Sequence, residues 1–302
     1  DLGSNMNKQD SIISKRQKLH AVRVLRDRIF VVGFALGVIA GILGLAALLF
    51  DVLIDGLPFL NINFLTSYAS RKAENSGILA PLAGTIWIVG MTALLTIPIG
   101  VGTAIYLEEF ASKNRLNRLI ELNIANLAGV PSVIYGLLGL AVFVQFLFNG
   151  SRNVTAGALT MTLLILPIVV IASQEAIKAV PSSYRDAAYA MGANRWQVVK
   201  AVVLPQALPG MMSGIILALS RAIGESAPIL IISSLVWVTF IPTSPDSKFT
   251  VLPLQIFTWI SQPQHSFRGI AAAAIIVLLI VLLSMNGIAI WIRSKYQSRP
   301  DQ

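Results

Sequence analysis

Residues 180–228, VPSSYRDAAYAMGANRWQVVKAVVLPQALPGMMSGIILALSRAIGESAP, join a charged, glycine-containing loop to a long apolar segment. The first half is polar enough to face water, and four basic residues lie in it or beside it: Lys178, Arg185, Arg195 and Lys200. The second half is long and apolar enough to cross a bilayer, which takes about 20 residues. A water-facing loop joined to a span that contains charges predicts a protein that couples an event outside the membrane to passage through it.

The composition indicates a membrane protein. Of the 302 residues 55% are hydrophobic and 12% are charged, whereas soluble domains carry about 25% charged residues. The chain has no cysteine, and His20 and His265 are far apart in the sequence, which argues against disulfides, thiolate chemistry and Cys/His metal sites. The basic residues behind the net charge of +9 gather in loops beside apolar segments. This placement indicates membrane topology and no nucleic-acid partner.

Six apolar segments predict an all-α polytopic membrane protein with six transmembrane helices. Pro98, followed by Gly100 and Gly102, is expected to bend or break the second of them, because proline lacks a backbone donor. Residues 51–80 and 237–267 are expected to be polar loops. The six predicted spans cover approximately residues 29–50, 81–107, 124–148, 154–176, 206–236 and 269–292.

Polar segments flank the predicted transmembrane domain, which covers residues 29–292 and includes a long loop at 177–205. Residues 1–5 precede the first methionine and are expected to be a cloning remnant. Residues 6–28 form a basic arm that we expect to lie on the membrane surface as an amphipathic helix, and residues 293–302 form a tail. Six spans put both termini on one side, which carries most of the 23 Lys and Arg residues. The positive-inside rule therefore predicts that the termini and the 177–205 loop are cytoplasmic.

The local sequence of this loop predicts two short helices. Tyr184, Ala187, Ala188 and Met191 recur at i, i+3, i+4 and i+7, which gives a helix with one apolar face. Gly192 then allows a left-handed stop, and a second helix is expected to begin near the following asparagine, residue 194. Such a helix at the end of a span suits docking in the cleft of a partner. The alternative is an amphipathic helix packed on the protein's own spans.

The same loop carries a spaced motif. Asp186-Ala187-Ala188 is followed after three residues by Gly192, after nine more by Val202, and one residue later by Leu204-Pro205. This is similar to the pattern E-A-A, three residues, G, nine residues, I, one residue, L-P of bacterial ABC importer permeases, with conservative departures at Asp186 and Val202. The resemblance implies that the loop docks on a cytoplasmic ATPase. The residues that we expect to form this docking site are Tyr184, Arg185, Asp186, Ala187, Ala188, Met191, Gly192, Leu204 and Pro205.

Arg221 and Glu225 place two charges near the middle of the fifth predicted span. Charges at that depth cost about 2.5–3.5 kcal/mol each on insertion scales, so each needs a partner or a water-filled path. At i and i+4 they share a helix face, and one interpretation is that they only neutralise each other. The other is that this face lines a polar route, on which the Arg221 guanidinium suits a tetrahedral oxyanion. Ser220 and Ser226 add hydroxyls nearby, and Pro228 is expected to distort the helix just beyond.

Further stretches extend the resemblance to most of the chain. They are Arg221-Ala-Ile-Gly-Glu-Ser-Ala-Pro228, Pro98-Ile-Gly-Val-Gly102, Tyr106-Leu-Glu-Glu109 and Ala128-Gly-Val-Pro-Ser132. With the loop motif, they make the region from about residue 80 to 290 similar to the PstA-type membrane subunit of bacterial phosphate ABC importers. The resemblance implies the type I ABC importer permease fold, alternating access driven by ATP, and a phosphate path that includes Arg221 and Glu225.

The resemblance also implies partners and a location. These are a homologous permease subunit that forms a heterodimer with this one, two copies of a cytoplasmic ATPase subunit, and an extracytoplasmic phosphate-binding protein. The complex is expected in the bacterial plasma (inner) membrane, surrounded by lipid. No cofactor is expected in this chain, because ATP and Mg²⁺ belong to the partner ATPase.

Other function classes fit the sequence less well. An ATPase or other enzyme is not expected, because the chain has no Gly-Lys dipeptide and hence no P-loop, and its span charges make no catalytic unit. A passive channel would not need the docking loop. Among permeases, two alternatives stay open, namely the sister PstC-type subunit of the same importer and a permease for another oxyanion.

Overall fold

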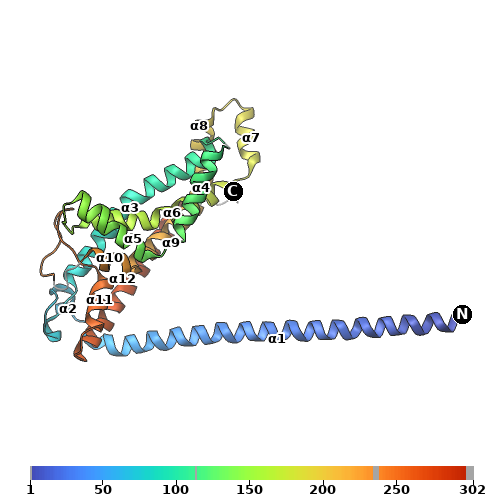
Figure 1. The fold of residues 1–302 in the computed structure, drawn as a ribbon, viewed down its shortest axis with the longest axis horizontal. Helices are drawn as coiled ribbons and strands as arrows, with labels where there is room; N and C mark the ends of the chain where they lie inside the picture. The colour runs from blue at the N-terminus through green and yellow to red at the C-terminus, as the bar shows by residue number, and fades with distance from the viewer. Residues whose placement is uncertain (1, 113, 234–237, 297–302) are drawn as a thin grey trace. The chain divides into compact units, whose positions relative to one another are not determined.

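The computed structural model describes residues 2–112, 114–233 and 238–296, which are helical along most of their length (Figure 1). The chain divides into two compact units, 1–54 and 55–302. The short elements of the second unit are η1 (Leu57–Phe59), α2 (Ile62–Thr66), η2 (Ala73–Asn75), the π-helical turns η3 (Tyr106–Phe110), η4 (Gly139–Leu147) and η5 (Val199–Val203), α5 (Ser132–Leu138), α7 (Ser182–Ala190), α8 (Arg195–Val198), α10 (Ala227–Ile232) and α11 (Leu252–Ile260). Its long helices are α3 (Leu79–Ile105), α4 (Arg115–Ala128), α6 (Val154–Lys178), α9 (Leu204–Gly224) and α12 (Ser266–Tyr296).

The first unit belongs to one helix, α1 (Leu2–Gly56). Residues 2–5 of the predicted cloning remnant, the basic arm and the first span all lie on this helix, so its backbone shows no boundary between a surface segment and a span. The chain has no proline before Pro58, and so no residue that must interrupt the hydrogen-bond ladder. The helix also continues past residue 50, which corrects the predicted start of the polar loop.

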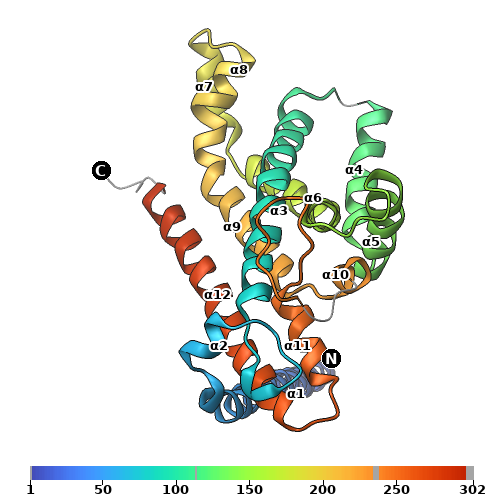
Figure 2. The ribbon, with the colours of Figure 1, turned by 90° about the vertical axis from the view of Figure 1, so that its left-hand side faces the viewer.

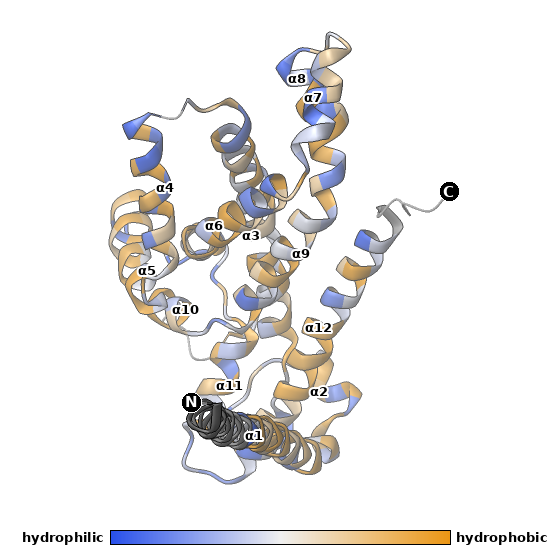
Figure 3. Ribbon diagram, turned by 90° about the vertical axis from the view of Figure 1, so that its right-hand side faces the viewer, coloured by the Kyte–Doolittle hydropathy of each residue, from blue (hydrophilic) through white to orange (hydrophobic). Residues whose placement is uncertain are grey.

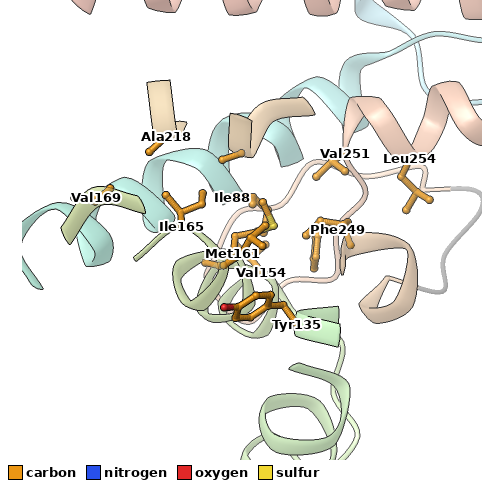
Figure 4. Packing of buried hydrophobic residues seen from close by; sticks show 14 of the residues in the cluster. Ile88, Tyr135, Val154, Met161, Ile165, Val169, Ala218, Phe249, Val251 and Leu254 are labelled. Carbon is orange, nitrogen blue, oxygen red and sulfur yellow. The ribbon is translucent and has the colours of Figure 1, made fainter. Parts of the chain in front are cut away.

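Helices α3, α6 and α9 form the centre of the second unit. Met161 of α6 lies at the middle of the main apolar cluster, with Ile88 of α3, Ala218 of α9 and Phe249 around it (Figure 4). These four residues are at most 5% exposed, although they come from segments far apart in the chain. The central helices therefore bury apolar faces against one another and leave their remaining faces to lipid or to other chains.

The helix breaks do not lie where the sequence predicted them. Pro98 does not break the second span, because α3 runs through it to Ile105 and is followed by η3. The third span, predicted as one helix over 124–148, is instead α4 and the α5–η4 segment, which meet at an angle of 105°. The turn between them holds Gly129 and Pro131, and the proline cannot supply the backbone donor that a continuous helix needs.

The two segments predicted as polar loops contain helices. Residues 51–80 hold the end of α1, then η1, α2 and η2, and residues 237–267 hold α11. Trp259 of α11 is fully buried and packs beside Phe64 of α2, with a distance of 6.2 Å between ring centroids. Short helices of this kind escape a search for long apolar runs, because their stability comes from packing on other segments.

The second unit has two distinct ends. The α7 and α8 helices lie at one end, whereas α2 and α11 lie at the other, and α12 runs from the second toward the first (Figure 2). Hydrophilic residues gather on α7, α8 and the start of α4, and the helices between the ends are mostly apolar (Figure 3).

Five helices in the described ranges are long and apolar enough to cross a membrane, and the bent pair makes a sixth if it is one span. This agrees with the predicted six-span, all-α architecture. The predicted tail, 293–302, lies partly outside the described residues, since residues 297–302 are not described. The same holds for residues 234–236, the end of the predicted fifth span.

Candidate functional site

The fifth span is broken at the residues that carry the candidate path. Helix α9 ends at Gly224, Glu225 has extended backbone angles (φ −77°, ψ 107°), and α10 begins at Ala227. Pro228 explains the break, because it has no N–H to donate to the carbonyl of Gly224, four residues earlier. The sequence predicted a distortion just beyond the two charges, at Pro228; the structure has it slightly earlier, so that Glu225 lies in the break and not on the helix face that carries Arg221. Irregular backbone at membrane depth is tolerated only inside protein or along a water-filled cavity.

Arg221 and Glu225 form an ion pair across the end of α9. The Nε atom of Arg221 lies 3.2 Å from Oε1 of Glu225, and the two side chains are 51% and 19% exposed. Arg221 lies in the last turn of α9, where the negative end of the helix dipole favours a cation. Glu225 lies beyond the helix and is oriented by the break. The pair thus presents a half-exposed guanidinium that is held by a more buried carboxylate.

The two predicted serines occupy different surroundings. Ser220 Oγ lies within hydrogen-bond distance of Asn286 Oδ1 on α12 and 2.7 Å from the carbonyl oxygen of Ile216. Ser226 lies in the break itself, half-buried, and does not cap α10 with its side chain. Asn286 was not predicted as part of the site, although a lone amide inside an apolar span is a signal that could have identified it.

A second polar pair joins α9 to α12 near the first. Arg293 donates from Nη1 to Ser213 Oγ at 2.8 Å. Ser213 and Ser220 are seven residues apart, as are Asn286 and Arg293, so each pair of residues lies on one face of its helix. The face of α9 next to Arg221 is therefore linked to α12 by side-chain hydrogen bonds at two levels.

A small cavity adjoins Glu225 inside the chain. It has a volume of about 10 Å³ and is lined by side chains of α3, α6, α9 and α10, including Thr85, Met161 and Ile229. A single water molecule needs about 10–15 Å³. The cavity is therefore too small for an oxyanion of four oxygen atoms.

The 177–205 loop forms the two helices that its sequence predicts. Helix α7 ends before Gly192, which has a left-handed φ of +83°. Asn194 then caps α8 with a capping box, in which its Oδ1 accepts from the N–H of Gln197 at 2.9 Å and the Gln197 side chain accepts from the N–H of Asn194 at 2.8 Å. The predicted glycine stop and the second helix near residue 194 are both confirmed.

The residues of the apolar face predicted for α7 differ widely in burial. Ala188 is 5% exposed and belongs to an apolar cluster with Val180, whereas Tyr184 is 52% and Met191 is 83% exposed. Ala187 and Asp186 are also exposed, Leu204 is half-buried and Pro205 is exposed. The inner side of α7 thus packs on the protein, as the alternative interpretation held, while its outer side stays open. Trp196 of α8, 61% exposed, adds to that open surface and was not predicted.

Arg185 points inward, unlike its neighbours. Its Nη2 lies 2.9 Å and its Nε 3.2 Å from Oε1 of Glu109, in the turn η3 that follows α3. The guanidinium also donates to the carbonyl oxygens of Val180 at 2.6 Å and of Ile177 at 2.9 Å. The Arg185 guanidinium is therefore engaged by groups within the chain, although it was predicted as part of the docking surface.

Comparisons with known proteins agree with this architecture. Residues 96–297 match the family described as "Binding-protein-dependent transport system inner membrane component". The chain is 33% identical to the probable ABC transporter permease protein YqgI of Bacillus subtilis over 272 residues, covering 86% of this chain and 92% of that one. It is 34% identical to the phosphate transport system permease protein PstA 1 of Mycobacterium tuberculosis over 218 residues, covering 72% of this chain and 70% of that one.

Solved structures share the fold. The structure of a bacterial alginate ABC transporter, in complex with a periplasmic protein that holds an alginate pentasaccharide, has a chain with a TM-score of 0.66 to this one. The alignment covers 87% of this chain and 93% of that chain at 16% identity. The likeness extends to the type I importer permease fold and, at this identity, to the fold alone.

Proposed function

Because the chain belongs to the binding-protein-dependent transport system inner membrane component family, we propose that it is a membrane-spanning permease subunit of an ATP-driven inorganic phosphate importer. Its similarity to a permease named for phosphate transport supports this substrate. The observation that carries the proposal is Arg221, a half-exposed guanidinium held by Glu225 at a break in a spanning helix.

The chemistry of this site suits phosphate. A guanidinium offers a planar fork of donors that matches two oxygens of a tetrahedral anion. Glu225 keeps the cation paired when no anion is present, and an arriving anion competes with that carboxylate for the same N–H groups. Binding by exchange of partners leaves the cation compensated in both states, which lowers the cost of holding it inside the membrane. Ser220 and Ser226 lie on either side of the ion pair in the chain. Ser226 could donate its hydroxyl to the anion, whereas the Ser220 hydroxyl is engaged by Ile216 and Asn286 and would have to exchange partners to do so.

The path is completed by a second subunit. Since the cavity beside Glu225 is too small for the ion, the anion passes over the exposed side of Arg221. A homologous permease covering that side would enclose it. This is the reason, from this chain's own geometry, to propose the heterodimer.

The open surface of α7 and α8 is the proposed docking surface for the ATPase. Tyr184, Met191 and Trp196 expose apolar side chains at the tip of the loop, and Asp186 and Ala187 lie between them. Each permease would contact one copy of a cytoplasmic ATPase, which binds ATP and Mg²⁺, and this chain would supply no catalytic group. An extracytoplasmic phosphate-binding protein would deliver the ion at the opposite end, near α2 and α11. Both termini and the loop are then cytoplasmic in a bacterial plasma membrane.

Uptake by the reconstituted complex tests the proposal. The chain, its partner permease, the ATPase and the binding protein are placed in liposomes, and ATP-dependent accumulation of radioactive phosphate is measured. Arg221→Gln should abolish uptake while the four components still co-purify. Arg118→Gln, which removes an exposed arginine of α4, is the matched control and should transport normally.

Competition identifies the ion. Excess unlabelled phosphate should suppress uptake, whereas equal sulfate should not. Wild-type transport by Arg221→Gln would show that Arg221 is not part of the path. A preference for sulfate would show that the substrate is sulfate and not phosphate.

A further inference from the structure

Two acidic residues at the end of α3 are unused by the proposed transport path. They lie in η3, the π-helical turn that follows α3 at the end of the second unit that carries α7 and α8 (Figure 1). Glu108 accepts from Gln174 Nε2 at 2.9 Å and lies 3.4 Å from Lys178 Nζ, both on α6. Glu109 is more deeply placed, with its side chain 8% exposed. A buried carboxylate of this kind needs a partner, and its partner comes from the docking loop.

Arg185 ties three elements together. From α7, two nitrogens of Arg185 contact Glu109 of η3. The same side chain donates to the carbonyl oxygens of Ile177 and Val180, at and just beyond the end of α6. The arginine side chain is itself only 20% exposed. Separating such a pair leaves two poorly solvated charges and is strongly unfavourable. The structure therefore resists any movement of α7 that does not carry the end of α3 with it.

Phe110, the residue after Glu109, contacts the second docking helix, α8. The guanidinium carbon of Arg195 lies 5.5 Å from the centroid of the Phe110 ring, and the rings of Phe110 and Trp196 are 6.3 Å apart. Arg195 and Trp196 both belong to α8. Consecutive residues of η3, Glu109 and Phe110, thus contact α7 and α8 respectively.

Helix α3 connects this point to the candidate path. Thr85, Ile88 and Val89 of α3 line the small cavity beside Glu225. Val89 and Glu109 are separated by about 30 Å if the intervening residues rise as in an α-helix. The segment from α3 to η3 therefore has docking contacts at its end and, in the first half of α3, contacts to the cavity beside Glu225.

We propose that the Glu109–Arg185 pair is the joint through which movement of the docking helices reaches α3 and, along it, the anion path. Arg185 is then a positioning residue inside the permease and not a contact to the ATPase. The inference rests on the proposed function, because it requires an ATPase bound to α7 and an ion transported past Arg221. It predicts that weakening the joint separates ATP hydrolysis from transport.

The test uses Glu109→Gln in the reconstituted complex, which keeps the shape and an acceptor but removes the charge. We expect the ATPase to co-purify and hydrolyse ATP, while phosphate transported per ATP falls about tenfold, within the range of coupling between distant sites. Glu175→Gln is the matched control, because Glu175 forms an exposed ion pair with Lys178 beside the joint (side chains 68% and 52% exposed). Exposed pairs contribute little, so this variant should keep the wild-type ratio.

A covalent link provides the second variant. The chain has no cysteine, so in the double variant Glu109→Cys, Arg185→Cys a short bismaleimide can join no other pair within this chain. Without the link, the double variant should transport less phosphate per ATP than the wild type, and linking should restore the ratio. The same comparison tests the joint if Glu109→Gln fails to retain the ATPase. A wild-type ratio in Glu109→Gln, or no recovery on linking, overturns the joint. Absence of ATP-dependent phosphate uptake by the wild-type complex is a different result, which overturns the proposed function.

Discussion

The Nε atom of Arg221 lies 3.2 Å from Oε1 of Glu225, on opposite sides of the last residue of α9. In an uninterrupted helix, i and i+4 residues are neighbours on one face. Here the backbone of Glu225 is extended, so the carboxylate is positioned by the break and by the start of α10. The geometry of the pair therefore depends on the break between α9 and α10 and not on a continuous helix.

Glu225→Gln should change binding and turnover in opposite senses. Without the competing carboxylate, Arg221 holds the anion more tightly, so the KM for phosphate falls. Release then becomes slower, and the maximal rate falls as well. The split is measured from the phosphate dependence of initial uptake by the reconstituted complex. An unchanged KM would mean that Glu225 does not compete with the ion.

Gly192→Val should disable the docking loop without disturbing the spans. A Cβ at Gly192 meets nothing within 4 Å, so the cost comes from the backbone, whose φ of +83° is unfavourable for a β-branched residue. Left-handed geometry costs ordinary residues about 1–2 kcal/mol. We expect loss of bound ATPase or of transport-linked hydrolysis, measured by co-purification and ATP turnover. Gly192→Asn is the control, since asparagine tolerates this conformation, and equal defects in both variants would contradict the explanation.

Gly84→Ala should destabilise the fold near the candidate path. The added Cβ would lie 1.9 Å from the carbonyl oxygen of Thr250, in a segment whose backbone packs against α3. Forcing the two apart should cost about 1–3 kcal/mol or more. The measurement is the unfolding temperature of the purified protein in detergent. Gly90→Ala lies on the same helix with nothing within 4 Å, and it should not lower that temperature, because alanine is the better helix former.

Ser220 and Asn286 should show a measurable coupling free energy. Their contact joins α9 to α12, and hydrogen bonds between membrane helices contribute about 1 kcal/mol. A double-mutant cycle with Ser220→Ala and Asn286→Ala, followed by unfolding in mixed micelles, should recover a value of that order. Ser220→Ala combined with Thr103→Ala, whose hydroxyl bonds within its own helix, should be additive. Additivity of the first pair would show that the interhelical bond contributes nothing to stability.

The docking loop illustrates what could be predicted from residues close in the chain. Its turn at Gly192 and its second helix at Asn194 depend on a left-handed glycine and a capping box, both of which involve residues at most three apart. The six apolar segments were equally accessible, because burial in lipid requires a long run of apolar residues. The positions of the breaks were harder to predict. Proline interrupts the chain at Pro131 and near Pro228, yet α3 passes through Pro98.

By itself, the sequence determined the class of protein, the approximate spans, the docking turn and the two charges in the fifth span, since each depends on composition or short-range spacing. Only the tertiary structure decided that Arg185 pairs with Glu109, 76 residues away, and that Ser220 hydrogen-bonds to Asn286, 66 residues away. It likewise decided that Ala188 faces inward and that Trp259 of α11 is buried. The physical reason is that a buried charge or amide is satisfied by whichever segment packs beside it, and packing between distant segments leaves no periodic signal in either one.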